Sequence, residues 1–376
     1  MGVVLDNPQG KITAPLLDHT EHPSHKLYVI GITGTNGKTT VAHLLGEVLK
    51  EVGYKPFVLG TLNSGNKDLS TPEPLDILKF MNDHLEQGGT HFVMEVTSEG
   101  IDQERIKHID FDVKVLTNIT HDHLDYHKTF QRYEAVKQRF MAEGDAHKIY
   151  PANFAETSVD FKTKLVGDFN LLNMKAAVTV LRHIGISEKY ICEVLSSCRP
   201  PRGRLENVEA GQKFMVLIDY AHTPDALQNA LFTVKKIAKH RNGRLLLLFG
   251  CGGNRDKGKR VQMGRIAGEI SDFFVVTDDN PRLEESQTIM DEIVQGIDLH
   301  FYDYVLIQDR RKAIEFIVNK AEGNDVIILA GKGHETYQVL KTETIYFDDQ
   351  EEVTKAILHR LTKECSLNEH EWHDAR

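Results

Sequence analysis

The sequence predicts an α/β protein of two domains, each built on a mostly parallel sheet. Short apolar runs alternate with amphipathic helical stretches almost from start to end, and this alternation restarts after Pro200-Pro201. Such alternation is typical of βαβ units, which place parallel strands side by side. A length of 376 residues also fits two domains.

The first half of the chain contains four expected strands separated by helical segments. The first buried strand is expected over residues 27–33 (LYVIGIT), and residues 39–52 form the helix expected after it. Three further apolar runs follow, FVLG (57–60), HFVMEV (91–96) and FDVKVLTN (111–118). We expect one domain over residues 27–203, preceded by a polar, proline-containing extension over residues 1–26.

The second half repeats the pattern after the expected linker RPPRG (199–203). Helices are expected at 224–239 and 311–321, between strands. These features predict a Rossmann-like α/β domain over residues 204–376. The expected strands are KFMVLIDY (213–220), GRLLLLFG (243–250), DFFVVTDD (272–279), YVLIQD (304–309) and DVIILAG (325–331).

Composition and charge exclude several classes of protein. A formal net charge of -10 argues against a nucleic-acid surface, which needs clustered Lys and Arg. No apolar run approaches the roughly 20 residues that cross a bilayer, and the N-terminus lacks the apolar core of a signal peptide. The four cysteines form no CxxC pair, so no disulfide scaffold or zinc ribbon is indicated. We expect a cytoplasmic enzyme that contacts neither nucleic acid nor membrane, with a monomer favoured.

The segment GITGTNGKTT (31–40) lies where the first strand becomes a helix. Glycines let backbone N–H groups face a phosphate, and the helix N-terminus adds its positive dipole end. Lys38 can reach the β- and γ-phosphates of ATP, and the Thr39 hydroxyl can ligate Mg²⁺. The spacing of a common P-loop would put a glycine at position 32, where this chain has isoleucine, so the motif is the shorter GxxGKT. The alternative is a glycine-rich turn without a ligand. The predicted P-loop residues are Gly34, Thr35, Asn36, Gly37, Lys38, Thr39 and Thr40.

Two further segments carry candidate metal ligands. Glu95, in MEVTSE (94–99), ends the third strand, where a carboxylate lies beside the P-loop and suits Mg²⁺. Taken alone, Glu95 could also be an ordinary loop acid. TNITHDHLDYH (117–127) holds three histidines, which invites a catalytic zinc interpretation. A loop that carries Mg²⁺-binding and substrate-orienting groups fits a P-loop protein better.

Seven segments in order resemble the signatures of the Mur ligase family. They are GITGTNGKTT, MEVTSE, TNITHDHLDYH, DYAHTPDAL, FGCGGNRDKGKR, DDNPRLEE and GKGHETYQ. Within the family they are most similar to the tripeptide synthetase (MurE-like) branch, from about residue 26 to about residue 349. The resemblance implies an ATP-dependent ligase that activates a carboxylate as an acyl phosphate and couples it to an amine.

For the ATP side, the resemblance implies that Lys38 and Thr39 hold the phosphates and a first Mg²⁺. Glu95 would share that Mg²⁺, and His123 would bind a second metal ion. Lys137 matches the lysine that these enzymes carry as a carbamate, which turns a cation into an anionic oxygen ligand. Without the resemblance, Lys137 would be a solvent-facing residue of an amphipathic helix.

The resemblance also assigns residues to the nucleotide and to both substrates. Arg204 would act on the phosphates, together with the DYAH segment, as the domains close. A bidentate guanidinium suits a second carboxylate, so the amine would be meso-diaminopimelate rather than lysine. The implied nucleotide contacts are Asn173, Arg204, Asp219 and His222, and the implied substrate contacts are Thr71, Thr97, Ser98, Arg255, Asn280, Arg282, Gly331 and Glu335.

Three departures from the family pattern fall on the carboxylate-substrate side. Only about 26 residues precede the first strand, too few for a UDP-binding domain with a core of its own. The connection from Lys137 to Gly167 is shorter than in the family, and Glu99 stands where MurE-like sequences usually have histidine. We expect a carboxylate substrate that is held differently, without UDP.

Three alternatives remain open at this point. The chain could be a true tripeptide synthetase whose UDP-binding part comes from another chain. It could be a Mur-like ligase that closes a ring of the nickel tetrapyrrole cofactor, although intact DNPR and GKGHE segments count against that reaction. It could also be a non-catalytic ATP-binding regulator, which the joint presence of Lys38, Glu95, His123 and Lys137 disfavours.

Overall fold

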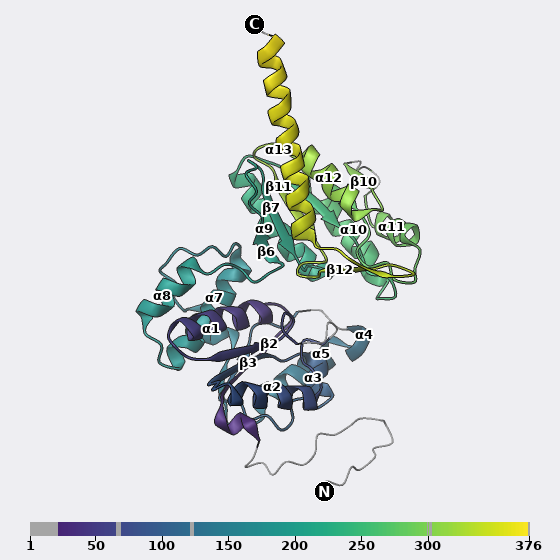
Figure 1. Cartoon of the computed structure of the whole chain (residues 1–376). Coiled ribbons are helices and arrows are strands. Elements are labelled where there is room, and N and C mark those ends of the chain that lie inside the picture. The colour runs from purple at the N-terminus through teal and green to yellow at the C-terminus, as the bar shows by residue number, and fades with distance from the viewer. Residues whose placement is uncertain (1–21, 65–68, 121–123, 299, 301–302, 375–376) are drawn as a thin grey trace. The chain divides into compact units, whose positions relative to one another are not determined.

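The computed structural model describes residues 22–64, 69–120, 124–298, 300 and 303–374. The chain divides into two compact units, Met1–Arg199 and Pro200–Arg376. Each unit contains its own sheet, and many of the elements are labelled in Figure 1. His123 lies outside the described residues, so its predicted metal-binding role stays a prediction.

The sheet of the N-terminal unit is entirely parallel, with the strand order β2-β3-β1-β4-β5. The four expected strands are present, and β5 adds a fifth that is only three residues long. In β1, Val29 and Ile30 point into different cores, as the twofold periodicity of a strand requires. The strands are β1 (Tyr28–Thr33), β2 (Pro56–Leu59), β3 (His91–Glu95), β4 (Val113–Leu116) and β5 (His147–Ile149).

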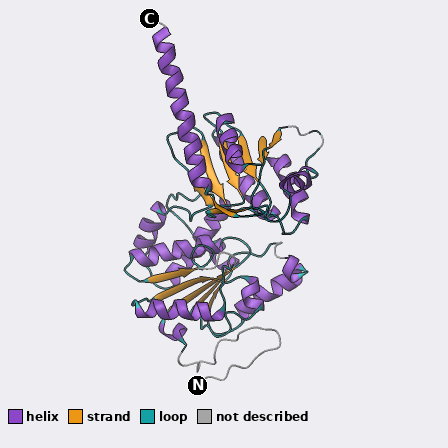
Figure 2. Ribbon diagram, turned by 45° about the vertical axis from the view of Figure 1, so that its right-hand side comes forward, coloured by secondary structure: helices purple, strands orange, loops and turns teal. Residues whose placement is uncertain are grey.

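Helices cover both faces of this sheet (Figure 2), which explains why its strands are nearly continuous apolar runs. One core contains the apolar residues of α1 and α7, and the other contains those of α2 and α5. The expected helix at 39–52 is present as α1, shifted by one residue. The helices are η2 (Pro23–Lys26), α1 (Lys38–Glu51), α2 (Pro74–Glu86), α3 (Ser98–Asp102), α4 (Leu124–His127), α5 (Phe130–Ala142), α6 (Pro151–Ala155), α7 (Asp168–His183) and α8 (Glu188–Ser197).

The C-terminal unit has a six-stranded sheet of order β10-β9-β8-β11-β7-β6, in which β6 runs antiparallel to β7. The five expected strands are present, whereas β6 and the β12-β13 hairpin were not predicted. All three are short and lack an apolar run. The strands are β6 (Arg204–Asn207), β7 (Met215–Asp219), β8 (Leu245–Phe249), β9 (Phe273–Val276), β10 (Tyr304–Leu306), β11 (Val326–Ala330), β12 (Tyr337–Val339) and β13 (Thr344–Tyr346).

Helices also flank this second sheet (Figure 2). Side chains of α12 and α13 pack with Val216 and Ile327 of the sheet in one core. The expected helices at 224–239 and 311–321 are present as α9 and α12, with ends that differ by one residue. The helices are α9 (Pro224–His240), α10 (Gly258–Ile270), α11 (Ser286–Val294), α12 (Arg310–Lys320) and α13 (Asp349–Asp374).

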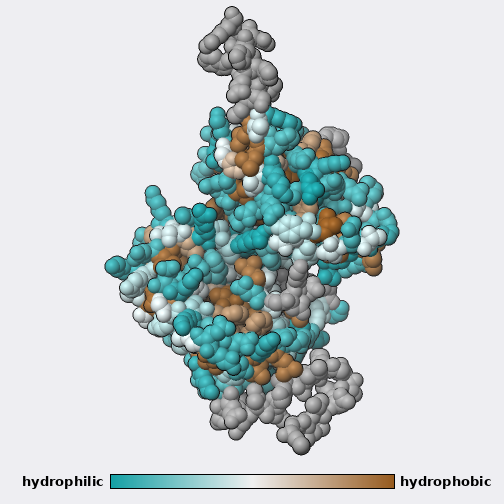
Figure 3. Space-filling model, viewed as in Figure 1, coloured by the Kyte–Doolittle hydropathy of each residue, from teal (hydrophilic) through white to brown (hydrophobic). Residues whose placement is uncertain are grey.

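Hydrophilic side chains cover most of the face that Figure 3 shows, and hydrophobic ones form small groups between them. Among the described helices, none has the length and apolar character that a membrane span requires. These observations agree with a charged residue content of 27%.

We expect Ile328→Ala to lower the free energy of unfolding of the C-terminal unit by about 2–5 kcal/mol. Ile328 is fully buried at the centre of β11, which pairs with β7 on one side and β8 on the other. Urea unfolding followed by circular dichroism measures the change. Leu358→Ala is the control, because that leucine is 51% exposed on α13, and its effect should stay within about 0.5 kcal/mol. Equal losses in the two variants would contradict this picture of the core.

Candidate active site

The candidate residues of the N-terminal unit gather where its parallel strands end. β1 lies between β3 and β4, and Ile32 of β1 is in register with Glu95 of β3. The segments after β1, β3 and β4 therefore leave the sheet at the same edge. Ligands of open parallel sheets bind at the carboxyl ends of the strands.

The predicted P-loop connects β1 to α1, and Gly37 caps the helix in a left-handed conformation, with φ of 91°. A side chain there would also collide with Asn173, since an added Cβ would lie 2.2 Å from its Oδ1. The Lys38 ammonium folds back over the loop and donates to the carbonyls of Gly34 and Thr35, each at 2.9 Å. A cation thus lies beside the N-terminus of α1, where phosphates bind in such folds.

The loop is held from the neighbouring strand by two residues that sequence reasoning did not single out. The Thr117 hydroxyl donates to the Asn36 carbonyl at 2.6 Å. The Asn118 side chain accepts from the Asn36 amide and donates to its carbonyl, both at 3.0 Å. Thr35 donates its amide to the Asn118 carbonyl at 2.9 Å. The segment after β4 therefore sets the shape of the P-loop.

Glu95 lies next to Thr39 and is almost fully buried, with 2% of its surface exposed. Its Oε2 accepts the Thr39 hydroxyl at 3.0 Å and the Thr61 hydroxyl at 3.2 Å, while Oε1 accepts the Thr61 amide at 2.9 Å. Glu95 is therefore not an ordinary loop acid. Thr61 was missed, although its position directly after an expected strand could have suggested it. Carboxylate and hydroxyl oxygens are the hard donors that Mg²⁺ prefers, so these residues fit that ion.

Lys137 lies on α5 and is 1% exposed, so the solvent-facing alternative is wrong. Its Nζ donates to the Gly34 carbonyl at 3.0 Å and approaches the Thr33 hydroxyl at 3.3 Å. The ammonium also lies 4.9 Å from the centre of the Tyr133 ring. The structure thus brings Lys137 and Lys38 to the same carbonyl of the P-loop.

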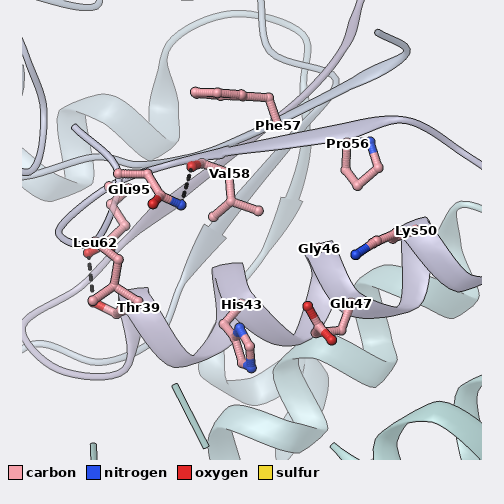
Figure 4. A pocket seen from close by; sticks show the side chains of 12 residues that line it. Thr39, His43, Gly46, Glu47, Lys50, Pro56, Phe57, Val58, Leu62 and Glu95 are labelled. Carbon is pink, nitrogen blue, oxygen red and sulfur yellow. Dashed lines mark hydrogen bonds between the residues drawn. The ribbon is translucent and has the colours of Figure 1, made fainter. Parts of the chain in front are cut away.

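A pocket of about 310 Å³ opens between α1 and β2 (Figure 4). Thr39 and Glu95 lie at one end of it, and Lys50 and Pro56 lie at the other. The face of α1 between them contributes His43 to the lining. The pocket therefore leads to the Thr39 hydroxyl and the Glu95 carboxylate from the side of β2, the edge strand.

The residues assigned to the carboxylate substrate support the end of β3. The Thr71 hydroxyl is fully buried, donates to the Glu95 carbonyl and accepts the Thr97 amide, both at 2.9 Å. Thr97 caps α3 by accepting the Gly100 amide at 3.1 Å. Ser98 is 1% exposed. These hydroxyl groups hold the segment beside Glu95 in place.

The residues assigned to the nucleotide in the C-terminal unit lie at the end of β7. The two carboxylate oxygens of Asp219 accept the amides of Leu205 and Ala221, at 2.8 and 2.9 Å. Burial raises the pKa of Asp219, and the nearby Arg204 opposes that rise. The Arg204 guanidinium lies 5.1 Å from the centre of the Tyr220 ring, and the His222 ring packs against the same tyrosine. Arg204, Asp219 and His222 thus form one group.

Two residues assigned to the amine substrate lie in direct contact. The Asn280 side chain donates to Glu335 Oε2 at 2.9 Å. The ammonium of Lys332, fully buried, donates to the same oxygen at 3.1 Å and to the Tyr337 carbonyl. Lys332 was not predicted, although it stands inside the GKGHE segment. Burial and the neighbouring Asp279 raise the pKa of Glu335, whereas Lys332 lowers it.

Two arginines and one further carboxylate complete this group. An added Cβ at Gly252 would lie 2.9 Å from Arg282 Nη1 and 3.6 Å from Arg255 Cγ, so both arginines lie beside this glycine. Arg282 also donates to the carbonyls of Gly253 and Asn280, at 3.1 and 3.3 Å, which rules out a freely solvated turn residue. Asp279 Oδ2 is buried and accepts no hydrogen bond within the described residues. It faces Gly331, where an added Cβ would lie 2.7 Å away.

Comparison with known proteins agrees with this arrangement. The family model of the Mur ligase middle domain matches residues 32–153, and that of the Mur ligase glutamate ligase domain matches residues 203–333. A UDP-N-acetylmuramoyl-L-alanyl-D-glutamate–2,6-diaminopimelate ligase of Bacillus cereus is 36% identical over 91% of this chain and 80% of its own length.

Two solved structures share the fold. A UDP-N-acetylmuramoyl-L-alanyl-D-glutamate–2,6-diaminopimelate ligase is 29% identical, with a TM-score of 0.58 over 89% of this chain and 79% of that one. The MurF ligase of Thermotoga maritima in complex with ADP is 18% identical, with a TM-score of 0.65 over 91% and 83% of the two chains. The second likeness concerns the fold alone. The domain matches and the identity to curated relatives together show that this chain belongs to the Mur ligase family of ATP-dependent ligases.

Proposed function

We propose that this enzyme transfers the γ-phosphoryl group of ATP to a substrate carboxylate and couples the resulting acyl phosphate to the amine of a diaminopimelate-like amino acid. The observation that carries the proposal is the buried contact between Thr39 and Glu95 under the Lys38 loop. Phosphoryl transfer is catalysed mainly by positioning and by neutralising charge, which is what this group of residues supplies.

On the ATP side, Lys38 binds the β- and γ-phosphates once its contacts with the loop carbonyls are released. Mg²⁺ would be held by Thr39 and Glu95 and would offset the charge that gathers on the phosphate oxygens. Lys137, carried as a carbamate, adds an anionic oxygen ligand beneath the loop. Asn173 borders the P-loop at Gly37 and contacts the nucleotide.

On the amine side, the substrate ammonium is received by Glu335 and Asn280, which already contact each other. Arg255 and Arg282 lie together at Gly252 and bind the carboxylates of the amino acid. Bidentate guanidinium contacts fix a planar carboxylate in place, which a lysine side chain on the substrate could not replace. A substrate with a second carboxylate at its far end therefore fits better than lysine, which carries only an ammonium there.

The identity of the carboxylate substrate is the least constrained part of the proposal. Glu99 lies in the first turn of α3 and accepts a hydrogen bond from Ser98 at 3.1 Å, next to residues assigned to this substrate. An acidic side chain there disfavours an anionic substrate group at the same position, so we propose a carboxylate substrate that differs from that of the relatives. Phosphate release, measured with a panel of UDP-linked and UDP-free carboxylates, identifies it.

We expect Lys38→Ala and Glu95→Gln to lower the ligation rate by about 100- to 1000-fold, the usual effect of removing one electrostatic stabiliser. Coupled measurement of ADP formation gives the rate, and circular dichroism shows whether the fold is kept. Glu51→Gln is the matched control, because Glu51 is an exposed acid at the far end of the same helix α1. Near wild-type turnover in Lys38→Ala or Glu95→Gln would remove the assignment.

A second prediction concerns the carbamate of Lys137. Lys137→Ala should lose activity and regain part of it with added acetate, because a small carboxylate can take the place of the missing carbamate. Lys114→Ala is the control, since Lys114 is also buried and donates to two backbone carbonyls. Acetate should not rescue the control. If bicarbonate depletion leaves the wild type unchanged and Lys137→Ala is active, the idea is wrong.

The third prediction concerns the choice of amine. meso-Diaminopimelate should be used in preference to lysine, and Arg282→Ala should erase most of that preference, at roughly 1.5–3 kcal/mol for a charged hydrogen bond. The ratio of kcat/KM for the two amino acids measures it. Arg265→Ala serves as control, because Arg265 is an exposed arginine of α10 paired with Glu269. Equal use of both amino acids by the wild type would overturn the amine assignment.

A further inference from the structure

A completely buried ion pair lies beside the residues of the C-terminal unit that are assigned to the amine substrate. Arg310 is the first residue of α12, and Asp349 is the first residue of α13. Neither side chain has any exposed surface. The Arg310 guanidinium donates two hydrogen bonds to the Asp349 carboxylate, from Nε at 2.8 Å and from Nη2 at 2.7 Å. Such a fork fixes the orientation of the guanidinium as well as its position.

The remaining donors of Arg310 reach two backbone carbonyls at the carboxyl edge of the sheet. Nη1 approaches the Asp278 carbonyl at 3.4 Å, and Nη2 approaches the Ala330 carbonyl at 3.3 Å. The first carbonyl directly precedes Asp279 and Asn280, and the second directly precedes Gly331 and Lys332. One guanidinium therefore contacts both segments that carry the residues assigned to the amine substrate.

Stability alone does not explain this arrangement. Replacing a buried ion pair with apolar residues of similar volume is often neutral or stabilising, because desolvating two charges is costly. The contacts of Arg310 with the two functional segments give the pair a role that apolar residues could not fill.

We propose that Arg310 is a positioning residue of the amine subsite, which sets the spacing of the 278–280 and 330–332 segments and supplies positive charge behind Glu335, with Asp349 as the partner that holds it. The proposal rests on the assignment of Asn280 and Glu335 to the amine substrate. In this proposal Arg310 does not touch the substrate and acts only through the 278–280 and 330–332 segments.

The charges around Glu335 show why a second cation matters. Lys332 and Asn280 contact its carboxylate directly, and Asp279, Tyr220 and Arg310 interact with it electrostatically. Burial and Asp279 raise the pKa of Glu335. An ionised Glu335 binds an ammonium, so affinity for the amine rises as pH increases through that pKa. Positive charge from Arg310 lowers the pKa and keeps Glu335 ionised at lower pH.

The test measures the dissociation constant of meso-diaminopimelate as a function of pH, by calorimetry on the full chain with a non-hydrolysable ATP analogue. Arg310→Lys keeps the charge but loses the bidentate contact, so affinity should fall by about 10- to 100-fold, the usual effect of losing one charged hydrogen bond in a binding site, while the midpoint pH stays in place. Arg310→Gln should move the midpoint to higher pH. Asp349→Asn leaves the cation unopposed and should move it to lower pH. A purely structural pair would weaken binding in all variants without opposite shifts of the midpoint, and that result would overturn the proposal.

Hydrogen exchange of residues 278–283 and 330–336 provides a second readout that needs no substrate. Arg310→Lys and the double variant Arg310→Gln/Asp349→Asn, which leaves no unpaired buried charge, should both exchange faster in these segments. Unchanged exchange would overturn the positioning role, even if the wild type failed to bind diaminopimelate. Failure of the wild type to bind would instead overturn the amine assignment.

Arg244 and Asp325 provide the matched control pair. Arg244 donates from Nε to Asp325 Oδ1 and from Nη2 to Oδ2, in a bidentate contact at the opposite, amino-terminal ends of β8 and β11. Arg244→Lys and Asp325→Asn should change stability without moving the diaminopimelate affinity, the midpoint pH or the exchange of the two segments. Equal effects from this distant pair would show that any loss of stability disturbs the subsite.

Discussion

The buried carboxylate of Glu95 is the constraint on which the ATP side of the molecule depends. It ends β3, receives the hydroxyl of Thr39 from the start of α1, and receives the hydroxyl and amide of Thr61 from the segment after β2. Three segments are thereby joined at one edge of the sheet. The donors that reach Glu95 in these contacts are all neutral. A buried anion satisfied by neutral dipoles keeps its attraction for a cation, which is the condition that a site for Mg²⁺ has to meet.

In the C-terminal unit, two acids and a buried lysine lie at the carboxyl edge of the sheet. Asp279 and Glu335 are two acids in a desolvated setting, and Lys332 lies against the second of them. Asp279 Oδ2 is buried and accepts no hydrogen bond within the described residues, so an acceptor remains for a cationic group of a ligand. In the proposed function, the substrate ammonium meets that requirement, and the arginines beside Gly252 bind a carboxylate of the same substrate. The group proposed to contact the nucleotide differs, because it consists of the Arg204 guanidinium and the His222 ring, which both pack against Tyr220.

The sequence predicts most of the fold, because strands buried on both faces are continuous apolar runs and the helices between them are amphipathic. β5, β6 and the β12-β13 hairpin escape that reasoning, since three or four residues without an apolar run carry no periodic signal. Among site residues, the P-loop and Glu95 follow from motif and strand position. The burial of Lys137 does not follow, because a lysine on an amphipathic helix looks exposed. Thr61, Lys332 and Arg310 act through neighbours that are distant in sequence, and only the three-dimensional structure brings these together. The predicted role of His123 remains a prediction.

Glu95 and Arg310 illustrate two uses of a buried charge. Glu95 is surrounded by hydroxyl and amide donors, so its charge remains available to a bound cation. Arg310 donates two hydrogen bonds to Asp349, which fixes its orientation, and its remaining donors contact the backbone of the two neighbouring segments. We propose that Glu95 attracts a bound cation, whereas Arg310 stabilises the segments that bind the ligand. Because a guanidinium stays protonated at any physiological pH, the second kind of charge keeps the geometry constant while Glu335 titrates. In the proposed subsite, Glu335 can therefore change its protonation state while Arg310 keeps the spacing of the two segments.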